Sequence, residues 1–237
     1  MRWRSAVHVC AFLVALESHG EAVRPTLSNG VVSYVAEAGQ RRQIQVGKKC
    51  ADLWVAPDES VIAFIAIDKA QPATANEIEP FIEESSIYIA RKSDHFKPVH
   101  LVVRVAIDRR TWKVVRQPSV SPDLKTVYFS VPFTMTSWKL LSTSLPAHSY
   151  TTIGNADSYC VIWGGEHSGE LLMEIRREAD PTDPKPGVSY PCYLRTKSGA
   201  LTKVADEGQC WGFGDFAVQW SRDHGGTCQP ADVRINN

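Results

Sequence analysis

Short runs of β-branched and aromatic residues, separated by turn-forming residues, dominate this chain of 237 residues. For example, residues 114–120 and 126–131 flank residues 121–125, which contain Ser-Pro-Asp. Proline and glycine stand between such runs, where a turn requires fixed or positive φ, rather than inside them. No segment shows a helical period sustained over three turns. Many short strands with few helices predict an all-β fold, which is a sandwich, a barrel or a propeller.

A sequence repeat favours the propeller among these three folds. Residues 54–58 (Trp-Val-Ala-Pro-Asp) and 119–123 (Ser-Val-Ser-Pro-Asp) each precede an apolar-aromatic run. Residues 216–223 read as a third, degraded copy of the same pattern. The copies indicate a unit of roughly 40–45 residues, which is the size of a four-stranded propeller blade.

The clearest copy, residues 120–129, carries a family resemblance. Val-Ser-Pro-Asp, followed by a Lys-Thr-Val-Tyr-Phe strand, resembles the repeat of the TolB-like β-propellers, which are WD-repeat-like. It is also similar to blades of the prolyl-oligopeptidase and dipeptidyl-peptidase propeller domains. The TolB-like resemblance implies a periplasmic setting and protein partners.

We therefore expect a small β-propeller of about four blades, each with four antiparallel strands. The last blade combines both ends of the chain, with residues 216–220 as its inner strand. The alternative is an open fan of three blades that pairs with a second copy, so the protein is a monomer or a homodimer. The segments assigned to the blades are residues 53–105, 114–153 and 159–204, with residues 31–46, 216–220 and 232–235 in the fourth.

The first residues have the order of a secretory signal peptide. A basic start at residues 1–4 precedes an apolar run at residues 6–16, and small residues follow at Gly20 and Ala22. We expect a signal peptide at residues 1–22 and a single propeller domain at residues 23–237. The apolar run is too short to span a bilayer, so the protein is not expected to be integral to a membrane. Export makes it periplasmic or secreted.

The charge balance narrows the class of partner, and the number of cysteines limits the number of disulfides. The chain has 26 lysine and arginine residues and 26 aspartate and glutamate residues, so no net positive field favours nucleic acid. Without its leader the chain keeps five cysteines, enough for two bridges and one free thiol. Several pairings are open. The first choice is Cys50 with Cys210, because both lie in connections that lead into inner strands.

The candidate site lies where outer strands connect to the next inner strand, because these connections rim the channel of a propeller. Candidate ligand-binding residues at or just before the four inner strands are Asp52, Gln117, Asp157 and Asp215. They are either a ring of ligands for a cation or another small ligand, or solvated residues that shape turns. The seven histidines form no H-x-x-x-H or H-E-x-x-H pair, and no C-x-x-C is present, so no metal or cofactor is expected.

The leading functional hypothesis is an exported, non-enzymatic scaffold that binds a protein or peptide. Residues 165–169 (Gly-Glu-His-Ser-Gly) do not fit the G-x-S-x-G nucleophile pattern. One alternative is a carbohydrate-active hydrolase or lyase that uses Asp52, Asp157 and Asp215. Another is a propeller that binds a small ligand or cation. Trp54, Trp163 and Trp220 are expected between blades, whereas exposure of Trp112, Trp138 or Trp211 would mark a partner or sugar surface.

Overall fold

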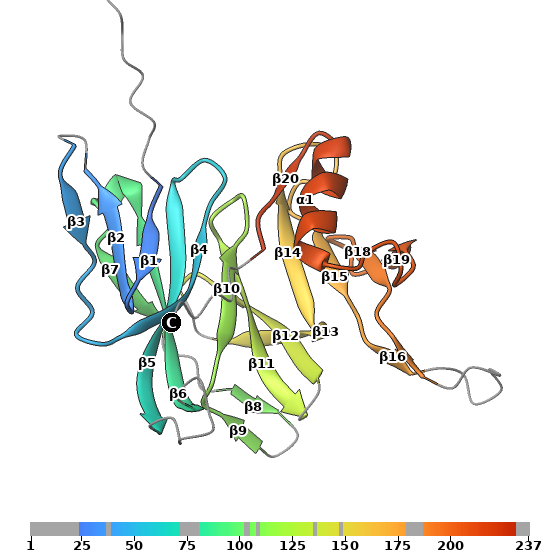
Figure 1. The fold of residues 1–237 in the computed structure, drawn as a ribbon, viewed down its shortest axis with the longest axis horizontal. Helices are drawn as coiled ribbons and strands as arrows, with labels where there is room; N and C mark the ends of the chain where they lie inside the picture. The colour runs from blue at the N-terminus through green and yellow to red at the C-terminus, as the bar shows by residue number, and fades with distance from the viewer. Residues whose placement is uncertain are drawn as a thin grey trace, which may run out of the picture.

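Two four-stranded antiparallel sheets and one five-stranded antiparallel sheet, arranged like the blades of a propeller, form the body of the protein (Figure 1). This computed structural model describes residues 24–36, 39–71, 81–101, 105–107, 110–134, 137–146, 149–178 and 187–230. The first two blades are meanders, in which successive strands pair with one another, and in the third a short two-stranded ladder is inserted between the second and third strands. The expectation of an all-β propeller fold is thereby confirmed.

The three blades follow one another along the chain. Blade 1 comprises β4 (Cys50–Val55), β5 (Val61–Gln71), β6 (Phe81–Arg91) and β7 (Pro98–Leu101). Blade 2 comprises β10 (Arg116–Val120), β11 (Thr126–Thr134), β12 (Ser137–Ser144) and β13 (Tyr150–Asn155). Blade 3 comprises β14 (Ser158–Trp163), β15 (Leu171–Glu174), β18 (Cys192–Arg195) and β19 (Leu201–Ala205).

Smaller elements flank the blades. β1 (Thr26–Ser28), β2 (Val31–Val35) and β3 (Arg41–Gln43) form an N-terminal sheet, and β20 (Thr227–Cys228) pairs with β14 on the inner edge of blade 3. The other elements are η1 (Lys92–Asp94), the ladder of β8 (Val105–Ile107) with β9 (Arg110–Trp112), the ladder of β16 (Arg177–Glu178) with β17 (Val188–Ser189), and helix α1 (Phe213–Asp223).

The repeated Pro-Asp segments form the turns that the sequence predicts. Asp58 Oδ1 accepts a hydrogen bond from the Ser60 N–H at 3.0 Å, and Asp123 Oδ1 accepts one from the Lys125 N–H at 3.0 Å. In each turn the aspartate carboxylate thus accepts a hydrogen bond from the N–H group two residues later, in place of a backbone carbonyl. The hydrogen bond from Ser121 to Asp123, with the Lys125 bond, holds the pKa of the Asp123 carboxyl below its usual range.

Alternating residues on the inner strands join each blade to two neighbours. In β5, Ala63 and Ile65 belong to the apolar cluster shared with blade 2, whereas Ile62 and Phe64 pack in the cluster shared with the N-terminal sheet. Successive side chains of a strand point to opposite faces, so a strand buried on both faces needs apolar residues at every position. β5 meets this requirement from Val61 to Ala66, where every residue is buried.

In blade 3, the neighbour on one face of β14 is a helix. Tyr159 and Val161 pack toward blade 2, while Cys160 and Ile162 pack in the cluster that contains Phe213 and Ala217 of α1. Helix α1 thus covers the face of blade 3 on which a following blade would pack (Figure 1). Within the part of the chain that the structure describes, no helix has the length and apolar character needed to cross a membrane.

The prediction of an inner strand at residues 216–220 is therefore wrong. This segment lies in α1, and its buried or partly buried residues recur with a helical spacing of three and four: Phe213, Phe216, Ala217, Trp220 and Ser221. A short apolar run such as Phe-Ala-Val does not distinguish strand from helix by itself. Gly212, with φ of 73°, stands directly before the helix and permits the sharp entry into it.

The fourth blade expected from the two termini does not form among the described residues, and the sheets do not close into a ring of four. Residues 232–235 lie outside the described part of the chain. A contact across the centre nevertheless joins the end of the described chain to blade 1, because the Trp54 indole N–H donates to the Gln229 carbonyl at 2.9 Å. The Trp54 and Trp163 rings also meet, with centroids 5.9 Å apart.

The disulfide also differs from the prediction. Cys160 is joined to Cys228, with Cα atoms 5.9 Å apart, which links β14 covalently to β20. Cys50 and Cys210 are free thiols in different apolar clusters: Cys50 lies between blade 1 and the N-terminal sheet, and Cys210 lies between blade 3 and α1. The expected Cys50–Cys210 pair is not formed, because the two thiols lie in separate apolar clusters.

Candidate binding cleft

Two of the four candidate residues occupy equivalent positions in successive blades. Asp52 lies in β4 with φ of 42°, and Gln117 lies in β10 with φ of 51°. At both positions the pairing with the next strand shifts register, as in a β-bulge. These bulges change the direction of the two side chains, so Asp52 and Gln117 have different surroundings from the regular inner-strand residues.

Asp52 is fully buried and joins blade 1 to blade 2. Its carboxylate accepts hydrogen bonds from Arg116 Nε at 2.6 Å and Arg116 Nη2 at 2.9 Å, and from the Gln117 backbone N–H at 2.9 Å. Only 14% of the Arg116 side chain is exposed. The carboxylate is thus engaged by three donors inside the protein, and it acts as a connector between blades.

Blade 3 is connected to blade 2 through Gln117. The Tyr159 hydroxyl donates a hydrogen bond to the Gln117 carbonyl, and Ser119 Oγ donates to the Tyr159 oxygen at 3.3 Å. The Gln117 side chain accepts a hydrogen bond from Ser130 Oγ at 3.1 Å. Burial of Tyr159 raises the pKa of its phenol, so this hydroxyl stays protonated and acts as a donor.

A cleft of about 520 Å³ opens beside Gln117 and Tyr159. Its walls come from blade 2, from the first two strands of blade 3, and from the residues that begin helix α1. The lining residues are Gln117, Ser158, Tyr159, Glu174, Tyr190, Glu207, Trp211, Gly212, Phe213, Gly214, Asp215 and Pro230. The structure thus brings two of the four candidates, Gln117 and Asp215, into one cavity.

Three acidic side chains line this cleft, and a fourth lies beside it. Glu174, Glu207 and Asp215 are on the wall, and Asp157 directly precedes the lining residue Ser158. Asp157 and Glu174 are also joined through their backbones, since the Asp157 N–H donates to the Glu174 carbonyl at 2.9 Å. Among the described residues no basic side chain lines the cleft, so its wall is electronegative.

Burial raises the pKa of both Asp157 and Glu174. For each, loss of contact with water is the largest cause, and the negative charge of Asp157 raises the pKa of Glu174 further. Asp157 Oδ2 is buried and has no hydrogen-bond partner in the described part of the chain. These two carboxylates are therefore unfavourable when ionised in the free protein, and a cationic group placed near them would relieve that cost.

Trp211 stands at the rim of the cleft with 83% of its surface exposed. It is the most exposed of the large apolar side chains that the structure describes. Trp54 is buried and Trp163 packs partly against the cluster between blades 1 and 2, as expected for tryptophans between blades. Trp220 instead lies in helix α1 and packs partly against the cluster between α1 and blade 3. Trp211 is therefore exposed, which is the condition under which a partner or sugar surface is expected at this residue.

Sequence reasoning alone did not identify the cleft residues Glu174, Glu207 and Trp211 as one group. They come from β15 and from the connection between β19 and α1, segments that are not adjacent in the sequence. The sequence signal that could identify part of this group is the run Cys-Trp-Gly-Phe-Gly at residues 210–214, in which two glycines flank an apolar residue before a helix.

We expect Asp157→Asn to stabilise the protein at neutral pH. The raised pKa means that the folded state binds the proton of Asp157 more tightly than the unfolded state, so ionisation costs stability as pH rises above the ordinary aspartate value of about 3.9. Partial exposure screens the charge, and the gain in Tm at pH 7 should be about 1–3 °C. Thermal unfolding at pH 7 and below pH 4 checks this.

The gain from Asp157→Asn should shrink as pH falls through the ordinary aspartate pKa of about 3.9 and disappear about one pH unit below it, where both states are protonated. The exposed Asp206→Asn is the matched control, since Asp206 lies on the surface beside Lys203, and it should not raise Tm at either pH. A lower Tm for Asp157→Asn at pH 7 would contradict the prediction.

Comparison with known proteins gives a likeness of fold only. No family model matches the sequence, and no curated protein matches it. Among solved structures, the β-propeller domain of the Trilobed protease from Pyrococcus furiosus has a TM-score of 0.47 at 12% identity, over 77% of this chain and 52% of that chain. The tricorn protease has a TM-score of 0.46 at 11% identity, over 78% of this chain and 17% of that chain. A putative TolB from Agrobacterium tumefaciens has a TM-score of 0.33 at 14% identity, over 88% of each chain.

Proposed function

We propose that this protein is an exported, non-enzymatic, TolB-like scaffold that binds a peptide segment of a protein partner in the cleft beside Trp211. The observation that carries the proposal is the combination of one largely exposed tryptophan with three acidic side chains on the wall of a single cleft. An aromatic ring supplies contact area at low entropic cost, and tryptophan is enriched among residues that dominate binding energy.

The charge of the cleft selects the kind of peptide. Glu174, Glu207 and Asp215 offer only acceptors when ionised, so a lysine or arginine side chain is the complementary group. A basic side chain near Glu174 would also offset the cost of ionising this partly buried carboxyl. The bound segment is therefore an extended peptide with a basic residue next to an apolar residue that packs on Trp211.

Two observations support the exported setting. Residues 1–22 have the order of a signal peptide, and the Cys160–Cys228 disulfide is of a kind that persists in oxidising compartments. The resemblance of residues 120–129 to the TolB-like repeat supports a periplasmic location and protein partners.

The geometry favours binding over carbohydrate hydrolysis by Asp52, Asp157 and Asp215. Asp52 is engaged by Arg116 and Gln117 inside the protein and is not on the wall of the cleft, so these three carboxylates do not share one cavity. A hydrolase mechanism would therefore have to use Asp157 and Asp215 without Asp52.

The test uses fluorescence anisotropy with two labelled nonapeptide pools that differ only at the centre, one with lysine and one with glutamate. The lysine pool should bind and the glutamate pool should not. Trp211→Ala should weaken binding at least tenfold, as for an aromatic residue at the centre of an interface. Leu201→Ala is the matched control, because Leu201 is an exposed apolar residue of β19 that does not line the cleft, and it should bind like the unmodified protein.

Two results would overturn the proposal. One is equal binding of both pools with no effect of Trp211→Ala. The other is turnover of a glycan panel that is lost in Glu174→Gln or Asp215→Asn, which would establish the hydrolase instead.

A further inference from the structure

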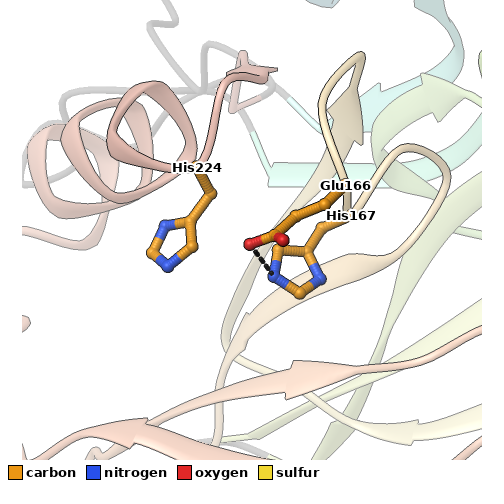
Figure 2. A group of neighbouring side chains, drawn as sticks. All are labelled: Glu166, His167 and His224. Carbon is orange, nitrogen blue, oxygen red and sulfur yellow. Dashed lines mark ion pairs between the residues drawn. The ribbon is translucent and has the colours of Figure 1, made fainter.

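A second group of polar side chains lies at the other end of helix α1. Glu166 and His167 belong to the turn between β14 and β15, and His224 directly follows the last residue of α1 (Figure 2). One ligand atom from each of the three side chains lies within 4.8 Å of the others. Figure 2 shows the three side chains directed toward one another, from the turn and from the helix end.

The fold holds these two segments together independently of the three side chains. β20 pairs with β14 at Ile162 and Trp163, and the Cys160–Cys228 disulfide fixes the same two strands. Gly165 lies directly against the residues after α1: a Cβ atom there would come within 2.5 Å of the His224 carbonyl oxygen. Only glycine permits this approach, which brings the turn next to His224.

Both imidazoles are oriented by a hydrogen bond at Nδ1. His224 Nδ1 lies 2.7 Å from the Trp220 carbonyl oxygen, which can only accept, so this nitrogen carries the proton. His167 Nδ1 lies 2.9 Å from Glu170 Oε2, a carboxylate oxygen that likewise accepts. In the His224 ring Nε2 is then the nitrogen with the free lone pair, whereas His167 Nε2 faces a Glu166 carboxylate oxygen at 3.1 Å and coordinates a metal only when it carries no proton. A carboxylate or carbonyl at one ring nitrogen is the usual partner of a metal-binding histidine.

Further contacts limit movement of the two rings. The Trp220 indole stacks on His224 with ring centroids 3.9 Å apart, and its centroid is 5.3 Å from that of His167. Glu166 is the adaptable member, because 66% of its side chain is exposed and its carboxylate lies 3.1 Å from His167 Nε2. Ligand atoms around a tetrahedral zinc ion stand about 3.4 Å apart. The three ligand atoms lie within 4.8 Å of one another, so coordination would require a rotation of Glu166 and a shift of one ring toward the other.

We propose that Glu166, His167 and His224 form a binding site for a divalent transition metal of the zinc class. His167 Nε2, His224 Nε2 and one Glu166 oxygen are the ligands, and Glu170 and the Trp220 carbonyl orient the imidazoles. Two imidazoles and one carboxylate are a ligand set that zinc accepts, with a fourth position for water or a partner. The metal links the β14–β15 turn to the end of α1, about 16 Å along the helix from the peptide cleft, and this site does not depend on the proposed function.

The histidine spacing explains why the sequence did not predict this site. His167 and His224 are 57 positions apart, and no H-x-x-x-H pattern connects them. The expectation of no metal depended on local motifs, whereas these ligands are brought together by the pairing of β20 with β14.

Isothermal titration calorimetry with zinc chloride tests the site, on the full chain freed of metal by chelation with its disulfide intact. One zinc ion should bind per chain. His167→Ala and His224→Ala should each weaken binding at least 100-fold, and Glu170→Gln should weaken it by about 10–100-fold through the orientation of His167. His100→Ala is the matched control, because His100 is an exposed histidine on β7 that stacks on Tyr88, and it should bind zinc normally.

A measurement on the unmodified chain keeps the proposal testable if a histidine variant does not fold. In long-range ¹H–¹⁵N spectra, zinc should shift the Nε2 signals of two histidines and leave the other imidazoles unchanged. At 100 times the dissociation constant, zinc should also raise Tm by about 5–10 °C. Absence of zinc binding, or binding that is unchanged in both His167→Ala and His224→Ala, would overturn the proposal.

Discussion

Asp52→Asn should lower the free energy of unfolding by about 3–5 kcal/mol, because it removes one partner of a buried ion pair. The Asp52 carboxylate accepts two hydrogen bonds from Arg116 and one from the Gln117 N–H, and it is fully buried. Asparagine tolerates the positive φ of 42° at this position, so the substitution removes the charge without adding backbone strain. The expected fall in Tm is about 10 °C or more, measured by thermal and urea unfolding.

The Asp52 prediction has two controls. Asp206→Asn, at an exposed ion pair with Lys203, should leave Tm almost unchanged. The double variant Asp52→Asn with Arg116→Gln should lose less stability than the sum of the two single variants, since neither charge is left without its partner. An Asp52→Asn protein that unfolds like the unmodified one would show that this ion pair does not connect the blades.

Replacing both Cys160 and Cys228 with alanine should cost about 2–5 kcal/mol, the range for native disulfides in small exported domains. The bridge closes a loop with a sequence separation of 68 residues, and it joins β20 to β14 beside helix α1. Its loss should free the C-terminal elements first, so hydrogen exchange should accelerate in β20 and α1 before blade 1. Urea unfolding and hydrogen exchange under non-reducing conditions provide the measurements.

Cys50→Ala is the comparison for the disulfide variant. Cys50 is a buried free thiol in the cluster between blade 1 and the N-terminal sheet, and burial raises its pKa to about 11. Its replacement should cost less than loss of the disulfide, and it should not change exchange in β20. The prediction fails if the double alanine variant and the oxidised protein have the same urea midpoint.

The local part of the fold could be predicted from the sequence, because the signals for it are local. The Pro-Asp turns at Asp58 and Asp123 and the apolar runs around them set the first hairpins of blades 1 and 2. The segment at residues 216–220 could not be assigned in this way, because a run of three apolar residues fits both a strand and the buried face of a helix.

The candidate site could be predicted only in part, for a related reason. Gln117 was predicted from its place at the start of an inner strand, and it does line the cleft. Asp215 also lines the cleft, but from the first turn of α1 rather than from a connection to an inner strand. The partners of each side chain depend on contacts between distant segments. Asp52 is directed to Arg116 by a bulge that shifts the register after Ala51, and the repeat pattern does not reveal such a bulge.

The hydrogen bond from Trp54 to Gln229 implies an order in which the chain can assemble. The contacts that join successive blades span 64 residues from Asp52 to Arg116 and 42 residues from Gln117 to Tyr159, whereas Trp54 and Gln229 are 175 residues apart. Closing a longer loop costs more entropy before any contact repays it. Neighbouring blades can therefore dock before the C-terminal segment is in place, and we expect the Trp54 indole N–H to acquire its acceptor late in folding.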